Sequence, residues 1–154
     1  MSKKYRVLRD QQEKANFWDF PESEYCVGTT TTNLKTGDYT LEHLVDKFSI
    51  ERKYSTGEIA TNINEKRFER ELDRLDKLDH SFILCEFTMD DIFSFPAMSG
   101  IPSKFWPKLR VSSNFLIKRL IEIETSHKTK IIFAGKHGSD YARRIFKRMN
   151  ELYE

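Results

Sequence analysis

The order of apolar and polar positions along the chain predicts an alternation of short strands and amphipathic helices. Short apolar or β-branched runs that are bounded by charged or turn-forming residues favour β-strands. Such runs cover residues 5–9, 25–33, 48–53, 81–87 and 129–134. A turn at residues 35–38 leads into one more extended segment, Tyr39-Thr40-Leu41. The run Phe82-Ile83-Leu84-Cys85 is apolar without interruption, so its strand should be buried on both faces at the centre of the sheet.

Helical periodicity accounts for most of the remaining chain. From residue 57 to 78, apolar side chains recur mostly at every third or fourth position, which predicts one long helix. A second helix is predicted at 113–126, where Ser112 or Ser113 can serve as the N-cap, and a third begins near residue 139. Together these elements predict an α/β fold with a mixed sheet of about five strands flanked by helices, in a single domain over residues 1–154.

Residues 88–111 interrupt this pattern. They contain three prolines and Gly100, so we expect a loop with short helical turns. Two neighbouring aromatic residues in this loop, Phe105 and Trp106, have two interpretations. They cap the hydrophobic core, or they stack on unpaired bases as aromatic side chains do in proteins that bind single strands.

Composition and charge limit the classes of protein to which this chain can belong. The chain has 154 residues, of which 38% are hydrophobic and 32% charged, and these values suit one soluble globular domain. Its net charge of +2 does not identify a nucleic-acid binder, so the distribution of charge has to carry that argument. Cys26 and Cys85 lie within predicted strands and fit a reducing compartment. The N-terminal residues include no apolar segment for a signal peptide or membrane span, so we expect a cytoplasmic protein with no membrane partner.

Acidic and basic side chains gather around the predicted strand at residues 48–53. Side chains alternate along a strand, so Glu51 and Lys53 share one face while Arg52 points to the other. Asp38 precedes this strand in the same hairpin. Two carboxylates are suitable ligands for Mg²⁺ or Mn²⁺, which can polarise a scissile phosphate and activate water. Lys53 would stabilise or orient the attacking hydroxide, so this arrangement predicts phosphodiester hydrolysis.

These charged residues belong to a longer pattern. Gly37-Asp38-Tyr39 is followed by Glu51-Arg52-Lys53, a long polar helix and the apolar strand Ile83-Leu84-Cys85-Glu86. The pattern resembles the nuclease domain of the XPF family of structure-specific endonucleases, a branch of the restriction-nuclease-like superfamily, and the resemblance covers residues 5–152. It implies a restriction-endonuclease-like core and a catalytic centre that contains Asp38, Glu51, Arg52 and Lys53. It also implies metal coordination by Asp38 and Glu51 with support from Asp10, and a position for Lys53 near the attacking water.

Two positions depart from the pattern of that family. The family carries Asp-x-Arg-Glu at the end of the first strand, and here Asp10 and Glu13 match while Gln12 replaces the arginine. The last aspartate of the family's pattern falls on Gly57, and Glu58 is one residue later. We therefore assign Glu13 and Glu58 as accessory residues of the predicted site.

A basic surface is predicted on the last helix. Four residues on its outer face can neutralise the phosphates of DNA, although a basic solvated helix face is equally ordinary. These residues are Arg143, Arg144, Lys147 and Arg148.

Two functions fit these observations. The leading hypothesis is a Mg²⁺- or Mn²⁺-dependent DNA endonuclease that acts on branched, nicked or partly single-stranded DNA. The alternative is a catalytically inactive nuclease-fold module that binds DNA or a protein. Retention of Asp38, Glu51 and Lys53 favours the enzyme, whereas Gln12 and Gly57 keep the alternative open. No helix-hairpin-helix module follows, so we expect a stand-alone, phage-like nuclease in its host's cytoplasm and leave a homodimer open.

Overall fold

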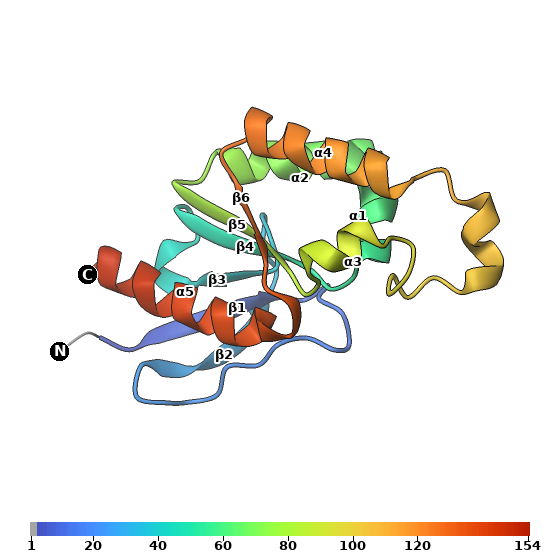
Figure 1. Ribbon diagram of the computed structural model, residues 1–154. Coiled ribbons are helices and arrows are strands. Elements are labelled where there is room, and N and C mark those ends of the chain that lie inside the picture. The colour runs from blue at the N-terminus through green and yellow to red at the C-terminus, as the bar shows by residue number, and fades with distance from the viewer. Residues whose placement is uncertain (1–2) are drawn as a thin grey trace.

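The computed structural model describes residues 3–154 and shows a six-stranded mixed sheet with helices on both faces (Figure 1). The strands lie in the order β2-β1-β3-β4-β5-β6 across the sheet. Their bounds are Tyr5–Asp10 for β1, Cys26–Thr32 for β2, Tyr39–Leu41 for β3, Phe48–Lys53 for β4, His80–Cys85 for β5 and Lys130–Phe133 for β6. The prediction of an α/β fold with a mixed sheet is confirmed.

Strand direction changes at the centre of the sheet. β1 and β2 are parallel, β3 is antiparallel to both β1 and β4, and β4, β5 and β6 run parallel to one another. The short segment Tyr39–Leu41 is a strand in its own right because it pairs along both of its edges. It makes the sheet one strand larger than the five or so that the sequence predicts.

Helices cover the two faces of the sheet unequally. Figure 1 shows α5 lying across one face, whereas α1 to α4 are on the opposite side. The helices are α1 (Thr56–Asn62), α2 (Lys66–Asp76), α3 (Met89–Phe93), α4 (Ser113–Ser126) and α5 (Gly138–Leu152), with 3-10 helices η1 (Glu42–Leu44), η2 (Ser103–Lys108) and η3 (Gly135–His137). Within residues 3–154, no helix is long and apolar enough to cross a membrane.

Each face of the sheet has its own hydrophobic cluster. Ile50 and Leu84 point toward α5 and pack in a cluster with Phe146. Ile83 and Cys85 point the other way, into a cluster with side chains of α1 to α4. β5 is therefore buried on both faces, as its uninterrupted apolar run predicts.

The single long helix expected over residues 57–78 is wrong, because the structure divides it into α1 and α2. A turn follows Asn62, and the N–H of Glu65 donates to the Asn62 carbonyl at 2.8 Å. The spacing of apolar residues in the sequence also indicates this break. Phe68 follows Ile63 after five positions, whereas residues on one face of a helix recur every three or four positions. Both helices nevertheless bury their apolar sides in the same cluster, so the periodicity continues across the turn.

The loop between β1 and β2 contributes aromatic side chains to the α5 face. Trp18 stacks on Tyr39 with a centroid distance of 5.1 Å, and Phe20 meets Phe146 of α5 edge to face at 5.0 Å. Such contacts stabilise a loop by burying large apolar areas in defined geometry. The loop is thereby fixed beneath α5.

Between α3 and α4 the chain leaves the body of the molecule and forms a projecting segment that contains η2 (Figure 1). All six residues of η2 are exposed. The interpretation that Phe105 and Trp106 cap the core is therefore wrong, because their side chains retain 45% and 37% exposure.

Candidate active site

A polar pocket of about 240 Å³ lies where the ends of β1 and β4 and the start of β3 meet α1 and α2. It collects predicted site residues that are widely separated in the sequence. The charged and amide side chains in its wall are Asp10, Gln12, Lys14, Lys35, Asp38, Glu51, Lys53, Glu58, Asn62, Glu65, Arg67, Glu71 and Arg74.

The turn that carries Asp38 is held closely against β4. Gly37 has a φ of 73°, a conformation that L side chains rarely adopt, and a Cβ at this position would overlap the hydroxyl of Ser49. The Asp38 N–H donates to the Ile50 carbonyl at 2.8 Å, and Asp38 Oδ2 accepts from the Arg52 N–H at 2.8 Å. Glycine at position 37 thus lets the Asp38 carboxylate reach the strand that bears Glu51.

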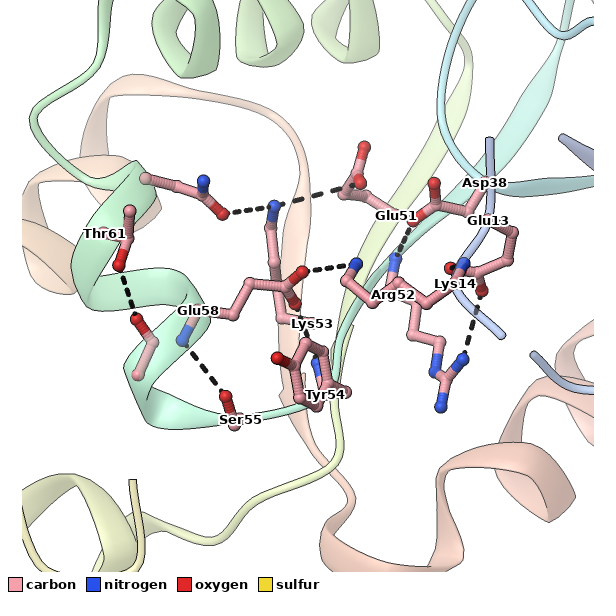
Figure 2. Close-up of polar contacts among 12 residues, drawn as sticks. Glu13, Lys14, Asp38, Glu51, Arg52, Lys53, Tyr54, Ser55, Glu58 and Thr61 are labelled. Carbon is pink, nitrogen blue, oxygen red and sulfur yellow. Dashed lines mark hydrogen bonds and ion pairs between the residues drawn. The ribbon is translucent and has the colours of Figure 1, made fainter. Parts of the chain in front are cut away.

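β4 places Glu51 and Lys53 on one face, as strand alternation predicts. Lys53 Nζ lies 3.9 Å from Glu51 Oε1 and donates to Asn62 Oδ1 at 2.9 Å (Figure 2). The same ammonium lies 5.0 Å from the centroid of the Phe68 ring. Asn62 is a site residue that sequence reasoning missed, because only the packing of α1 on β4 brings it to Lys53.

Glu51 is buried and Asp38 is half-buried, and their carboxyl groups are close enough to share a hydrogen bond when one of them is protonated. Burial raises the pKa of Glu51 well above its ordinary value, and the charge of Asp38 raises it further. Burial also raises the pKa of Asp38, although its hydrogen bond with Glu51 acts in the opposite direction. Two carboxylates this close need a proton or a cation between them, so the pair has the electrostatic character of a cation site.

Asp10 lines the same pocket, but its carboxylate already has backbone partners. Asp10 Oδ1 accepts from the N–H of Leu34 at 2.9 Å, and Oδ2 accepts from that of Gln12 at 3.3 Å. The Asp10 N–H in turn donates to the Asp38 carbonyl at 2.8 Å. Asp10 therefore ties β1 to the turn that carries Asp38, and its assignment as a metal ligand stays a prediction.

Arg52 points to the opposite face of β4 from Glu51 and Lys53 (Figure 2). Its Nη1 lies 3.2 Å from Glu13 Oε2, and its Nε donates to Glu86. Burial acts to lower the pKa of Arg52, but the two glutamates outweigh it and raise that pKa. Arg52 and Glu13 do not line the pocket and pair with each other instead. The catalytic role predicted for Arg52 and the accessory role predicted for Glu13 stay predictions.

The departure from the family's pattern at Gly57 has a steric cause. A Cβ at Gly57 would lie 2.5 Å from the carbonyl oxygen of Ser99, a distance that real Cβ atoms essentially never show. The neighbouring Glu58 lines the pocket, where it forms an ion pair with Lys14 and accepts a hydrogen bond from the Tyr54 N–H at 3.0 Å. The acidic side chain at this end of the pocket therefore comes from position 58.

Basic residues occur in two places with different surroundings. The pocket rim carries exposed residues that the sequence analysis did not single out, namely Lys14, Lys35, Arg67 and Arg74. The predicted DNA-binding residues of α5 lie on the other side of the sheet. There Arg143 and Arg144 both pair with Asp140, at 2.7 and 2.9 Å, and Lys147 lies over the ring of Tyr25.

A separate group of ligand-type side chains lies where the end of α2 meets the segment after α4. Carboxylate or ring atoms of Asp73, Asp76 and His127 lie within 4.8 Å of one another. Asp76 Oδ2 contacts His127 Nδ1 at 2.6 Å, and Asp76 Oδ1 accepts from the N–H of Lys128 at 2.9 Å. These hydrogen bonds give the group a structural role in joining α2 to the approach to β6.

The model of the ERCC4 domain matches residues 5–139 of this chain. The chain belongs to the ERCC4 domain family. No curated protein matches it. Its motif-based resemblance to the XPF family is therefore confirmed at the level of the domain.

Two solved structures of XPF from Aeropyrum pernix share the fold of this ERCC4 domain. The first, described as a complex with DNA, has a TM-score of 0.61 and 16% identity, and the match covers 98% of this chain and 67% of that one. The second has a TM-score of 0.58 and 16% identity, with 96% and 64% covered. The chain thus spans about two thirds of the length of these relatives.

Proposed function

We propose that this ERCC4 domain is a divalent-metal-dependent endodeoxyribonuclease. The observation that carries the proposal is the convergence of Asp38, Glu51 and Lys53 in one polar pocket. Membership of the ERCC4 family supports it, as does the resemblance to an XPF that was solved in complex with DNA. Its expected substrates are branched, nicked or partly single-stranded DNA.

The residues of the pocket fit a hard divalent cation. Asp38 and Glu51 offer carboxylate oxygens in contact with each other, and Lys53 balances only part of their charge. Asp10 lines the same pocket, and we propose that it supports them. When bound, Mg²⁺ or Mn²⁺ would supply Lewis-acid chemistry: it would polarise the scissile phosphate and lower the pKa of a bound water, so that this water loses a proton more easily and can attack as hydroxide.

Lys53 is the cationic side chain best placed to act on the reacting atoms. Asn62 and Glu51 hold its ammonium inside the pocket, and the surrounding protein excludes most water from it. In the proposed reaction the ammonium donates hydrogen bonds to the attacking oxygen and to the phosphate. It thereby stabilises the negative charge that grows in the transition state, an effect that is larger in a desolvated site.

The basic rim supplies a path for the DNA backbone. Arg67 and Arg74 project from α2 beside the pocket, and Lys35 lies on the turn that leads to Asp38. Phosphate contacts from such residues position the duplex without reading its sequence. We therefore propose that the DNA crosses the α2 side of the molecule, and the assignment of this role to α5 stays a competing prediction.

Cleavage of labelled duplex, nicked, flap and single-stranded DNA, with Mg²⁺ or Mn²⁺ and with EDTA, tests the proposed function. We expect metal-dependent cleavage of at least one substrate, and its loss in Asp38→Asn and Glu51→Gln. Metal-dependent cleavage that is undiminished in both variants would overturn the site. Tight DNA binding without cleavage of any of these substrates would support the inactive-module alternative, for which Gly57 is the relevant departure from the family.

A further inference from the structure

The projecting segment between α3 and α4, residues 99–111, is here called the arm (Figure 1). Its tip, η2, consists entirely of exposed residues and includes the adjacent aromatic side chains Phe105 and Trp106. Neighbouring exposed aromatic side chains that do not pack in the core form a patch of the kind that marks an interaction surface.

The arm nevertheless has a defined conformation. The Trp106 indole N–H donates to the Ile101 carbonyl at 2.8 Å, and the Leu109 N–H donates to the Trp106 carbonyl at 3.1 Å. At its base, Ile101, Leu109 and Val111 pack against the hydrophobic cluster formed by α1 to α4. Pro102 and Pro107 further restrict the backbone. The backbone of the arm and the Trp106 side chain are therefore held in place before binding, which lowers the entropic cost of binding.

The charge of the arm is uniformly positive. Its charged residues are Lys104, Lys108 and Arg110, and residues 99–111 include no aspartate or glutamate. Lys104 Nζ lies 5.0 Å from the centroid of the Phe105 ring, so a cation and an aromatic face are offered together. Stacking surfaces beside cations suit a strand whose bases are free to stack and whose phosphates are negative.

A second cavity lies between the base of the arm and α1, and it shares two wall residues with the active-site pocket. This cavity, of about 360 Å³, is lined by Tyr54 and Gly57 on one side and by Ser99 and Ile101 of the arm on the other. Glu58 and Asn62 line both this cavity and the active-site pocket. The close approach of Gly57 to the Ser99 carbonyl fixes the base of the arm at this junction. A strand that leaves the pocket past Tyr54, which is 42% exposed, would therefore run toward the base of the arm.

We infer that the arm binds unpaired nucleotides of the DNA substrate next to the cleavage site. Bases stack on Phe105 and Trp106, and the phosphates between them contact the basic residues of the arm. This inference rests on the proposed nuclease function, and what it adds is the part of the molecule that holds the unpaired nucleotides. A fully paired duplex cannot offer its bases to the arm.

Binding of fluorescein-labelled oligo(dT) in EDTA tests the inference independently of cleavage. We expect Phe105→Ala and Trp106→Ala each to weaken binding by about tenfold, the order expected for loss of one base–aromatic stack, whereas Trp106→Phe retains most of the affinity. Tyr141→Ala, which removes a 43% exposed aromatic from α5, is the matched control and should bind as the wild type does. Wild-type affinity in both arm variants would overturn the inference.

Intrinsic fluorescence gives a second readout. Of the chain's two tryptophans, Trp18 is 5% exposed whereas Trp106 is 37% exposed, so quenching by oligo(dT) should come from Trp106 and disappear in Trp106→Phe. Since Phe105 and Trp106 lie outside both hydrophobic clusters and retain 45% and 37% exposure, the melting temperature of the arm variants should stay close to that of the wild type. Quenching that persists unchanged in Trp106→Phe would contradict stacking on the arm.

Cleavage assays separate this inference from the proposed function. The arm variants should lose cleavage of flap substrates more than cleavage of nicked duplex, while Mn²⁺ binding stays unchanged. If the arm variants cut every substrate at the wild-type rate and Asp38→Asn is inactive, the arm inference fails and the nuclease proposal stands. If no DNA is cut but oligo(dT) binding depends on Trp106, the nuclease proposal fails and strand binding by the arm remains.

Discussion

Lys53 differs from an ordinary lysine on a strand. A solvated side chain on an exposed strand face would explain the Glu-x-Lys spacing equally well from sequence alone. The structure excludes that explanation, because Lys53 is only 5% exposed and its ammonium lies between Glu51 and Asn62. A buried charge needs compensating partners, and here the partners are groups of the proposed site.

Lys53→Met should abolish most cleavage while leaving metal binding intact. The substitution keeps an alkyl chain beside Phe68 but removes the ammonium, and loss of one electrostatic contributor typically lowers a rate by on the order of a hundredfold. Single-turnover cleavage and Mn²⁺ titration would measure the two effects. Lys47→Met, at a half-exposed lysine just before β4, is the control. Wild-type cleavage by folded Lys53→Met protein would end the catalytic assignment.

Glu51→Gln should stabilise the metal-free protein while it weakens metal binding. Glu51 is buried beside Asp38, so its charge is both desolvated and repelled, and the single ammonium of Lys53 offsets only part of this. Relief of such a functional constraint commonly raises the free energy of unfolding by about 1 kcal/mol. Urea unfolding in EDTA checks the prediction, with Glu71→Gln in the pocket wall as the control. A marked loss of stability would show that the carboxylate pair is not a source of unfavourable energy.

β4 serves two parts of the molecule because its charged side chains alternate in direction. Glu51 and Lys53 enter the pocket, whereas Arg52 joins β4 to Glu86 and to Glu13 in the loop after β1. The guanidinium carbon of Arg52 also lies 4.8 Å from the centroid of the Trp18 ring. One tripeptide thus supplies the proposed reacting groups and the contacts that hold the strand in place.

α2 and α5 are alternative locations for DNA binding, and charge reversal distinguishes them. Arg67→Glu combined with Arg74→Glu should weaken duplex binding by roughly tenfold or more at low salt, because both residues line the pocket rim. Arg144→Glu combined with Arg148→Glu makes the same change of charge on α5 and should have a smaller effect. Fluorescence anisotropy with one duplex would compare the pairs. A larger loss from the α5 pair would place the DNA on the opposite side of the sheet.

If the proposed function holds, the distribution of charge over the molecule, more than its net value of +2, governs how it meets DNA. Acidic residues concentrate inside the pocket, while basic residues surround it and extend along the arm. A polyanion therefore meets positive charge before it reaches the buried carboxylates. This arrangement separates binding of the DNA backbone from binding of the metal.

DNA affinity should consequently fall steeply with salt and depend little on metal. Neutralised phosphates release counterions, so the logarithm of the association constant should decrease linearly with the logarithm of salt concentration. Titrations of one duplex at several NaCl concentrations, in EDTA and in Ca²⁺ as a non-catalytic ion, would measure both dependences. Affinity that is insensitive to salt, or that requires the metal, would contradict a binding surface built from the basic rim.

Local sequence patterns predicted several features of this structure. The alternation of residues along β4 predicted that Glu51 and Lys53 share a face, and the Gly37-Asp38 turn placed a carboxylate before the strand. The uninterrupted apolar run of β5 likewise predicted a strand buried on both sides. Such features depend on neighbours within a few positions, so the sequence alone contains them.

Contacts between distant elements were decided only by the tertiary structure. The approach of α1 to β4 brings Asn62 to Lys53, and the Ser99 carbonyl leaves no room for a side chain at Gly57. The tertiary structure also leaves Trp106 exposed, although a tryptophan at this position of the sequence could equally have been a core residue. Sequence patterns state which side chains need burial or partners, but the partner itself depends on which elements meet across many residues of chain.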